Sequence, residues 1–170
     1  GANTVTIGCN NINDNGVIIG HNNTDRGANT VHIGGAVSIK DFADNTVSIG
    51  ESSDLFAANA VLTGNMSAIK NGATNSIGMG NFTEINGANS IVAGHSVVSS
   101  GANGIVLGSN ITTATGNQSV SMGTASSMSG DNAVGLGASS NVSANGGVAL
   151  GTNATVSDTN SVALGSGSST

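Results

Sequence analysis

The hexapeptide Asn-Ser-Val-Ala-Leu-Gly at residues 160–165 decides the fold, because degenerate copies of it recur along the whole chain. Two further copies are Asn-Thr-Val-Ser-Ile-Gly at residues 45–50 and Asn-Ser-Ile-Val-Ala-Gly at residues 89–94. The sequence contains twelve copies, and the commonest interval between their closing glycines is 14 residues. A fixed short period of this kind is typical of solenoid repeats. The closing glycines are Gly8, Gly20, Gly34, Gly50, Gly64, Gly80, Gly94, Gly108, Gly123, Gly137, Gly151 and Gly165.

Each copy places an apolar residue on either side of one variable residue, as in Val47, Ser48 and Ile49. This period of two predicts a short strand whose two apolar side chains face into the coil and whose variable side chain faces outward. The glycine then supplies the backbone freedom for a tight corner. Another apolar residue follows five positions after many of the glycines, as at Ile39 and Leu55, and predicts a second short strand. We therefore expect each repeat to form one turn of a narrow β-solenoid with parallel pairing between turns.

The variable middle residues carry no charge in any copy of the motif. Because a solvated row would hold charged side chains, we predict that this row is covered by a second surface, most simply a partner chain in a parallel homo-oligomer. For the histidine in the row, a hydrogen bond within the interface is favoured over a role as metal ligand. The predicted interface residues are Ile18, His32, Leu62, Val92, Val106, Ala149 and Ala163.

Composition argues against several other classes of protein. With 27 glycines, three phenylalanines and no proline, tryptophan or tyrosine, the chain must build its core from aliphatic side chains. The formal net charge is −6, and only Arg26, Lys40 and Lys70 are basic, which argues against binding to nucleic acid or to an anionic membrane. No apolar run approaches the roughly 18 residues of a membrane helix. The single cysteine, Cys9, excludes a disulfide scaffold.

The copies at residues 45–50, 89–94 and 160–165 resemble the Asn-Ser-Val-Ala-Ile-Gly repeat of the YadA-like head of trimeric autotransporter adhesins of Gram-negative bacteria. The resemblance covers essentially the whole chain. It implies a single head domain over residues 1–170, folded as an all-β, left-handed parallel β-roll (a β-solenoid) of about twelve 14-residue repeats and assembled as a homotrimer. It also implies a fragment of a longer protein, displayed on the bacterial surface and anchored in the outer membrane through a C-terminal region that this sequence lacks.

The resemblance further implies that the head attaches bacteria to host surfaces without catalysing a reaction and without a cofactor. The expected partners are two further copies of the chain and a host surface protein, such as a carcinoembryonic-antigen-type adhesion receptor, or collagen or fibronectin. No nucleic acid and no direct membrane contact by this fragment are expected.

Enzymatic and metal-binding alternatives find weak support in the sequence. The carboxylate pairs Asp41/Asp44 and Glu51/Asp54 could serve glycoside hydrolysis, but the chain has no Trp or Tyr on which a sugar could stack. The three histidines lack the clustered partners of a metal site. We therefore expect a protein that is not an enzyme and binds no metal.

Candidate binding residues lie around two repeats that are expanded to 16 residues, at residues 34–50 and 64–80. Insertions in a solenoid enter loops along one edge, where binding residues are often found. The three phenylalanines lie outside the strand motif, where they either cover the edge of a turn, fill a gap between chains, or anchor a receptor. Our hypothesis is a receptor-contact surface formed by Lys40, Phe42, Phe56, Lys70 and Phe82.

Charge is distributed unevenly along the chain. Seven of the nine acidic residues and all three basic residues precede residue 85. We therefore hypothesise that residues 1–85 bind and that residues 86–170 extend the structure. The alternative function is purely structural, as a spacer in a trimeric bacterial or phage fibre.

Overall fold

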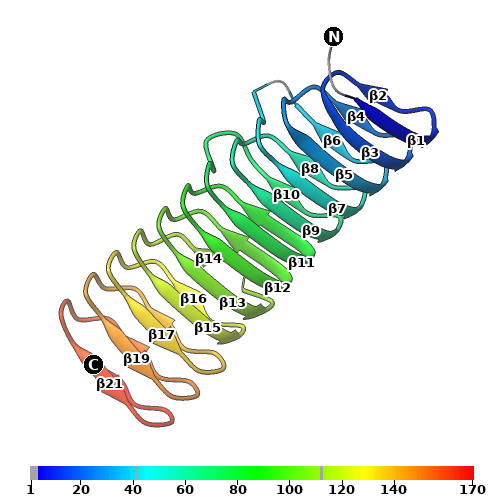
Figure 1. The fold of residues 1–170 in the computed structure, drawn as a ribbon. Helices are drawn as coiled ribbons and strands as arrows, with labels where there is room; N and C mark the ends of the chain where they lie inside the picture. The colour runs from blue at the N-terminus through cyan, green and yellow to red at the C-terminus, as the bar shows by residue number, and fades with distance from the viewer. Residues whose placement is uncertain (1–3, 41, 112) are drawn as a thin grey trace.

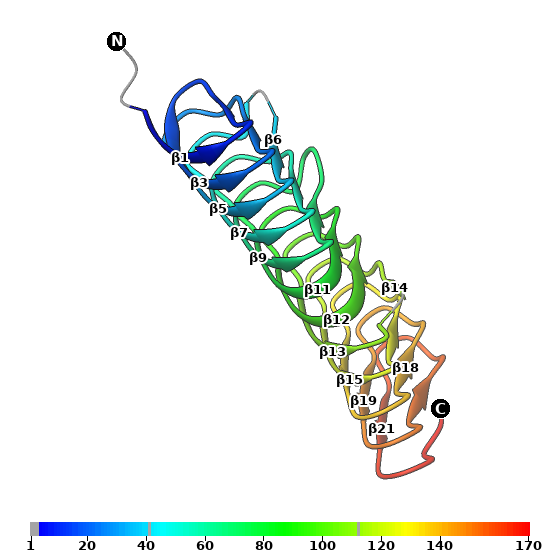
Figure 2. The ribbon, with the colours of Figure 1, turned by 90° about the vertical axis from the view of Figure 1, so that its right-hand side faces the viewer.

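The computed structural model describes residues 4–40, 42–111 and 113–170. These residues form an elongated coil of about 11 turns, with β1 and β21 at its opposite ends (Figure 1). The strands of the described residues join into one 21-stranded sheet, and no helix occurs among them. Seen from the side, the turns stack in register along the axis of the coil (Figure 2).

Most turns contribute one longer and one two-residue strand, and in β11 and β12 the two are continuous. The first row of strands consists of β1 (Val5–Cys9), β3 (Gly16–His21), β5 (Thr30–Gly35), β7 (Val47–Glu51), β9 (Val61–Asn65), β11 (Ile77–Ile85), β12 (Ile91–Ser99), β13 (Ile105–Ser109), β15 (Val120–Thr124), β17 (Val134–Leu136), β19 (Val148–Leu150) and β21 (Val162–Leu164). The second row consists of β2 (Ile12–Asn13), β4 (Thr24–Asp25), β6 (Ser38–Ile39), β8 (Asp54–Leu55), β10 (Ala68–Ile69), β14 (Thr113–Ala114), β16 (Ser127–Met128), β18 (Asn141–Val142) and β20 (Thr155–Val156).

Neighbouring turns pair in parallel, and the motif glycines set the register. Gly8 pairs with Gly20 across the 12-residue repeat, and Gly34 pairs with Gly50 across a 16-residue repeat. Extra residues therefore enter the loops and leave the ladder unchanged. The prediction of an all-β parallel β-solenoid is confirmed, with about 11 turns. The count of twelve repeats, the handedness and the number of chains stay predictions.

A second regular corner is made by the motif asparagines, which adopt the left-handed conformation that Asn tolerates better than most residues. Their φ values lie near 56°, as at Asn45 and Asn75. On successive turns their side-chain amides form a ladder, in which Asn45 Nδ2 donates to Asn59 Oδ1 at 3.1 Å and Asn59 Nδ2 donates to Asn75 Oδ1 at 3.2 Å. The motif asparagines from Asn29 to Asn103 thus cap successive turns and bond to one another along one edge.

In the first-row strands, the structure exchanges the inward and outward faces that the sequence predicted. The middle residue of each motif faces the inside of its own coil, and the two flanking residues face outward. The predicted interface residues Ile18, His32, Leu62, Val92, Val106, Ala149 and Ala163 are 0–2% exposed within a single chain, so they cannot form a surface for a partner. Because side chains in a strand alternate, an error of one position exchanges the two faces completely.

The reason for this orientation is the narrowness of the coil. The interior holds one residue of the first strand opposite an apolar residue of the second row, such as the fully buried Ile69 and Ile85. Where the middle residue is Gly135, a Cβ would lie 2.2 Å from the Cε of Met128, so the methionine already fills that space. A row that varies from glycine to leucine therefore reflects a tight shared core and not a weakly specified outer face.

The flanking apolar residues instead form a continuous hydrophobic outer face along the first row of strands. The most accessible of these side chains are 37–72% exposed. A stripe of this length is unusual on the surface of a single soluble chain. We call it the outer apolar face, and its most exposed members are Val5, Ile7, Ile19, Ile33, Ile49, Ile77, Met79, Ile91, Ile105, Met122, Val162 and Leu164.

Candidate functional site

Three predicted contact residues lie in one row on consecutive turns of the coil. Each position in this row follows a motif glycine by six residues, directly after the second strand of the turn. The backbone N–H groups of Lys40, Phe56 and Lys70 donate to second-row carbonyls of the next turn at 3.1, 2.9 and 2.8 Å. Arg26 makes the equivalent bond one turn earlier, at 3.2 Å. We call Arg26, Lys40, Phe56 and Lys70 the basic row.

Two lysines of the basic row, Lys40 and Lys70, contact the phenylalanine that lies between them. The Phe56 ring is half-buried, and the Nζ atoms of Lys40 and Lys70 lie 5.7 and 5.9 Å from its centroid. At these distances the negative ring face attracts an ammonium group. Lys70 Nζ also lies 3.9 Å from the Oε2 atom of Glu84, which is the one ion pair among the described residues. Lys40, Phe56 and Lys70 therefore form a cationic cluster, and Glu84 is its one carboxylate partner among the described residues.

The remaining two predicted contact residues lie elsewhere. Phe42 is 87% exposed on the loop that follows Lys40, at the same edge of the coil. Phe82 is 50% exposed at the glycine corner, at the other end of the second strand, and packs edge-on against the His95 ring at a centroid distance of 5.7 Å. The proposed five-residue surface is thus divided between two edges of the coil.

The carboxylates considered for hydrolysis have different surroundings. Asp44 Oδ1 accepts a hydrogen bond from the backbone N–H of Ala28 at 2.7 Å, so its carboxylate holds two neighbouring turns together. Glu51 and Asp54 are exposed. Asp41 lies outside the described residues.

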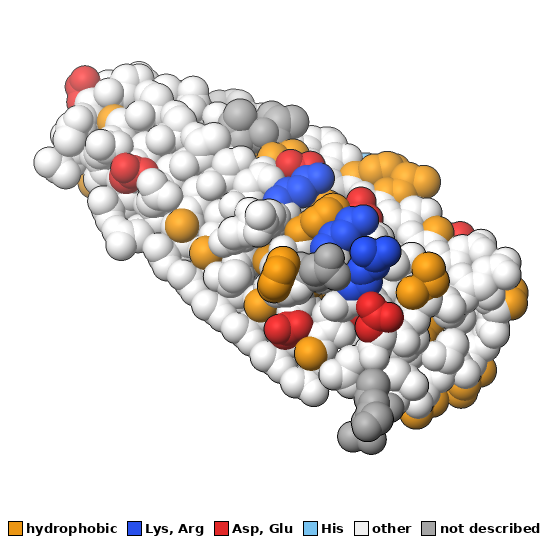
Figure 3. Space-filling view, turned by 90° about the horizontal axis from the view of Figure 1, so that it is seen from above, with side chains coloured by type: hydrophobic (Ala, Val, Ile, Leu, Met, Phe, Trp, Pro, Cys, Tyr) orange, Lys and Arg blue, Asp and Glu red, His pale blue; other side chains and the backbone are white. Residues whose placement is uncertain are grey.

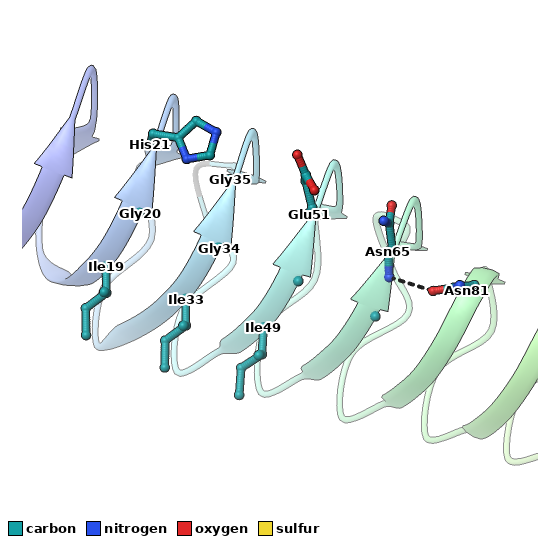
Figure 4. A pocket seen from close by; sticks show the side chains of 12 residues that line it. Ile19, Gly20, His21, Ile33, Gly34, Gly35, Ile49, Glu51, Asn65 and Asn81 are labelled. Atoms are coloured by element: carbon teal, nitrogen blue, oxygen red, sulfur yellow. Dashed lines mark hydrogen bonds between the residues drawn. The ribbon is translucent and has the colours of Figure 1, made fainter.

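A shallow groove of about 730 Å³ runs along the motif glycines, and the sequence analysis did not anticipate it. Isoleucines such as Ile19 and Ile33 line one side, while His21 and Glu51 stand on the other (Figure 4). The motif glycines Gly20, Gly34, Gly50 and Gly64 also line it. A glycine at the end of every repeat is the signal from which such a groove could have been inferred. The groove adjoins the outer apolar face and shares three of its isoleucines.

Two titratable groups lie inside the first turns. His32 is fully buried without a hydrogen-bond partner for either ring nitrogen among the described residues, so the predicted hydrogen-bonded interface role is wrong. Burial lowers the pKa of His32 from 6.5 to about 4. Burial also raises the pKa of Asp25, against the opposing effects of hydrogen bonds from the Thr30 hydroxyl and the Gly27 N–H. In both cases burial disfavours the charged form of the side chain, and the pKa shifts accordingly.

In the part of the chain that the structure describes, no group of three or more His, Cys, Asp or Glu side chains could hold a metal ion. None of the described residues belongs to a helix long and apolar enough to cross a membrane.

Comparison with known protein families finds two copies of the YadA head domain repeat, at residues 129–154 and 145–168. No curated protein matches the chain. The matched segment covers strands β17 to β21, whose turns pair in the same parallel register as the turns that precede them.

Proposed function

We propose that this chain, whose residues 129–168 are YadA head repeats, is the binding head of a bacterial surface adhesin that attaches to a host cell-surface receptor or an extracellular matrix protein. The observation that carries this proposal is that the parallel register of the matched repeats continues through the rest of the described chain. Inside the matched segment Gly135 pairs with Ala149, and the same motif position pairs Thr6 with Ile18 far outside it. The described chain therefore has the architecture of one adhesin-like domain, and this architecture is typical of proteins that bind without catalysis.

The outer apolar face supports assembly of three copies. Its exposed residues, such as Ile49 and Ile91, form an uncharged stripe along the first row of strands. Burying this stripe against two further copies would remove apolar surface from water at about 25 cal/mol per Å². We propose that the homotrimer packs through these flanking residues, because the middle residues are already buried within each chain.

The basic row and Phe42 are proposed as the receptor-contact surface. They lie on the loop edge after the second strand, away from the outer apolar face. An exposed aromatic beside ordered cations is a common form of binding hot spot. Phe82, at the other edge, is proposed as a second and separate contact. A carcinoembryonic-antigen-type receptor, collagen and fibronectin remain the proposed classes of protein partner, and the outer surface of the bacterium remains the proposed location.

The adhesive function is tested by binding the purified chain to intact epithelial cells, with and without prior protease treatment of the cells. We expect saturable binding that protease removes. A Phe42→Ala, Phe56→Ala variant should bind less, and a separate Phe82→Ala variant reports whether the second edge also contacts the receptor. Absence of binding to either cell preparation would contradict the proposal.

A structural spacer is the second candidate, and it is favoured by the plain chemistry of the second half. Residues 86–170 contain only Asp131 and Asp158 as charged residues. Under this alternative, residues 86–170 hold the first half away from the surface, and a spacer throughout would bind no cells at all. Substitutions of exposed residues in the second half should leave cell binding unchanged if the two halves divide these roles.

A further inference from the structure

We propose that the basic row binds a linear sulfated polysaccharide lying along the axis of the solenoid. The inference deepens the adhesive function and rests on it for its biological setting, because it names the chemistry of a host surface component. It begins from an uneven distribution of charge. The chain has a net charge of −6, yet all three of its basic residues belong to this one row. Figure 3 shows the Lys and Arg side chains gathered in one patch, with acidic side chains beside it.

The spacing of the row suits a linear polymer of sugars. Parallel strands lie about 4.8 Å apart, so Arg26 and Lys40 are separated by about one such step and Lys40 and Lys70 by about two. One step is close to the length of one pyranose unit. Sulfate groups on alternate sugars of an extended chain would therefore meet the two lysines.

The Phe56 ring prepares the two lysines for an anion. It lies between them in the row and holds both ammonium groups within 6 Å of its centroid. Both ammonium groups lie beside the same ring, and a bound sulfate would neutralise part of their joint positive charge. Contact with the ring restricts the lysine side chains before binding, so less side-chain entropy is lost when the anion arrives. The ring is also occupied by these lysines, which leaves it poorly placed as a stacking platform for a nucleic-acid base.

The ends of the row limit the length of the anion. Asp14 occupies the position before Arg26, since its N–H donates to the carbonyl of Asp25 at 3.1 Å. Beyond Lys70 the row continues with Asn86 and Ser100, whose side chains hydrogen-bond at 3.2 Å. Neutral amide and hydroxyl groups suit sugar hydroxyls. The site therefore has a cationic centre, a polar uncharged end and an acidic end.

The test measures binding of the full chain to heparin, with fully desulfated heparin and a single-stranded DNA oligonucleotide as comparison probes. We expect salt-dependent binding to heparin and much weaker binding to the other two. A Lys40→Gln, Asp158→Asn variant keeps the net charge of the original chain and should bind heparin about three- to fivefold more weakly. Replacing Phe56 by Leu should also weaken binding, although every cation is retained.

A gain-of-binding variant guards against loss through misfolding. Glu84→Gln removes the carboxylate that lies 3.9 Å from Lys70 Nζ and should strengthen heparin binding about twofold. Asp158→Asn makes the same change in net charge far along the chain and should leave binding unchanged. Equal effects of the two variants would overturn the site and leave only a general charge effect.

Two outcomes separate this inference from the adhesive function. Cell binding that survives enzymatic removal of heparan sulfate, together with no binding to heparin, would overturn the polysaccharide while adhesion stands. Binding to heparin without any binding to cells would support the site and contradict adhesion. Equal affinity for heparin and desulfated heparin, or for the DNA oligonucleotide, would also overturn the proposal.

Discussion

Replacement of one motif glycine should disrupt the coil at that turn, and Gly64→Ala is the clearest case. Gly64 has a φ of 148°, in a region that L-residues rarely adopt. A Cβ at this position would lie 1.7 Å from the carbonyl oxygen of Gly80 on the next turn. That oxygen belongs to the backbone, so no change of rotamer relieves the overlap. The two turns must separate, or the corner must change conformation.

The expected cost combines two effects. Backbone strain in a region reserved for glycine costs about 1–3 kcal/mol. Overpacking against a rigid neighbour adds a further 1–3 kcal/mol or so. We therefore expect Gly64→Ala to lower the free energy of unfolding by about 2–6 kcal/mol. Because each turn contacts chiefly its neighbours, the damage should be greatest around Gly64 and smaller towards both ends.

Gly104→Ala is the matched control, because Gly104 is buried, lies in an ordinary backbone conformation and has no atom closer than 3.5 Å to the position of a Cβ. It should be neutral or stabilise the protein by about 0.4–1 kcal/mol. Thermal and denaturant unfolding followed by circular dichroism would measure both variants. Equal stability of Gly64→Ala and Gly104→Ala would refute the account of the glycine corner.

Two further changes test the interior and the asparagine ladder. Because the pKa of His32 falls from 6.5 to about 4 on folding, the stability that its neutral form contributes is complete above about pH 6.5 and is lost as the pH falls towards 4, by up to about 3 kcal/mol. Denaturant unfolding of the original chain and of His32→Leu between pH 7 and 4 should show this loss of stability only in the original chain. Asp25 contributes in the opposite direction, but it does so equally in both proteins. Parallel curves of unfolding free energy against pH for the two proteins would contradict the assignment of the loss to His32. Gly146 has a φ of 68° at a position where most other repeats carry asparagine. Gly146→Asn should therefore extend the asparagine ladder towards Asn160 and stabilise the protein by about 0.5–1 kcal/mol. A lower melting temperature of this variant would show that the Asn160 amide cannot move aside to make room for the new side chain.

The sequence was sufficient to predict the repeat, its parallel register and the second strand. A glycine at the end of every repeat leaves the backbone few conformations there other than a tight corner. Residues such as Ile39 and Leu55 are fully buried, as their position five residues after a motif glycine predicts. Which face of the first strand points into the coil could not be predicted in the same way. A period of two defines two faces but does not say which is inside, and that choice depends on the width of the coil. The small residues Gly78 and Gly135 in the middle row were the available signal.

The candidate site was predicted in part. Lys40, Phe56 and Lys70 share a position six residues after a motif glycine, and this shared position accounts for their contact in the structure. Phe82 follows its glycine by two residues, so it belongs to the other edge. Counting from the glycine would also have added Arg26, which the sequence analysis did not include. Side-chain contacts such as that of Phe82 with His95 depend on the pairing of turns and follow only from the structure.

The most direct test of a head built from three copies is the mass of the chain in solution, measured by sedimentation equilibrium. We expect three times the mass of one chain, and we expect Ile49→Glu, Ile91→Glu to give single chains that keep their β circular dichroism, because two carboxylates would enter the outer apolar face. Glutamate in place of Ser52 and Ser96, which lie at the glycine corner, is the control and should leave the trimer intact. A single-chain mass for the original protein at high concentration, or an intact trimer in the Ile49→Glu, Ile91→Glu variant, would contradict assembly through this face.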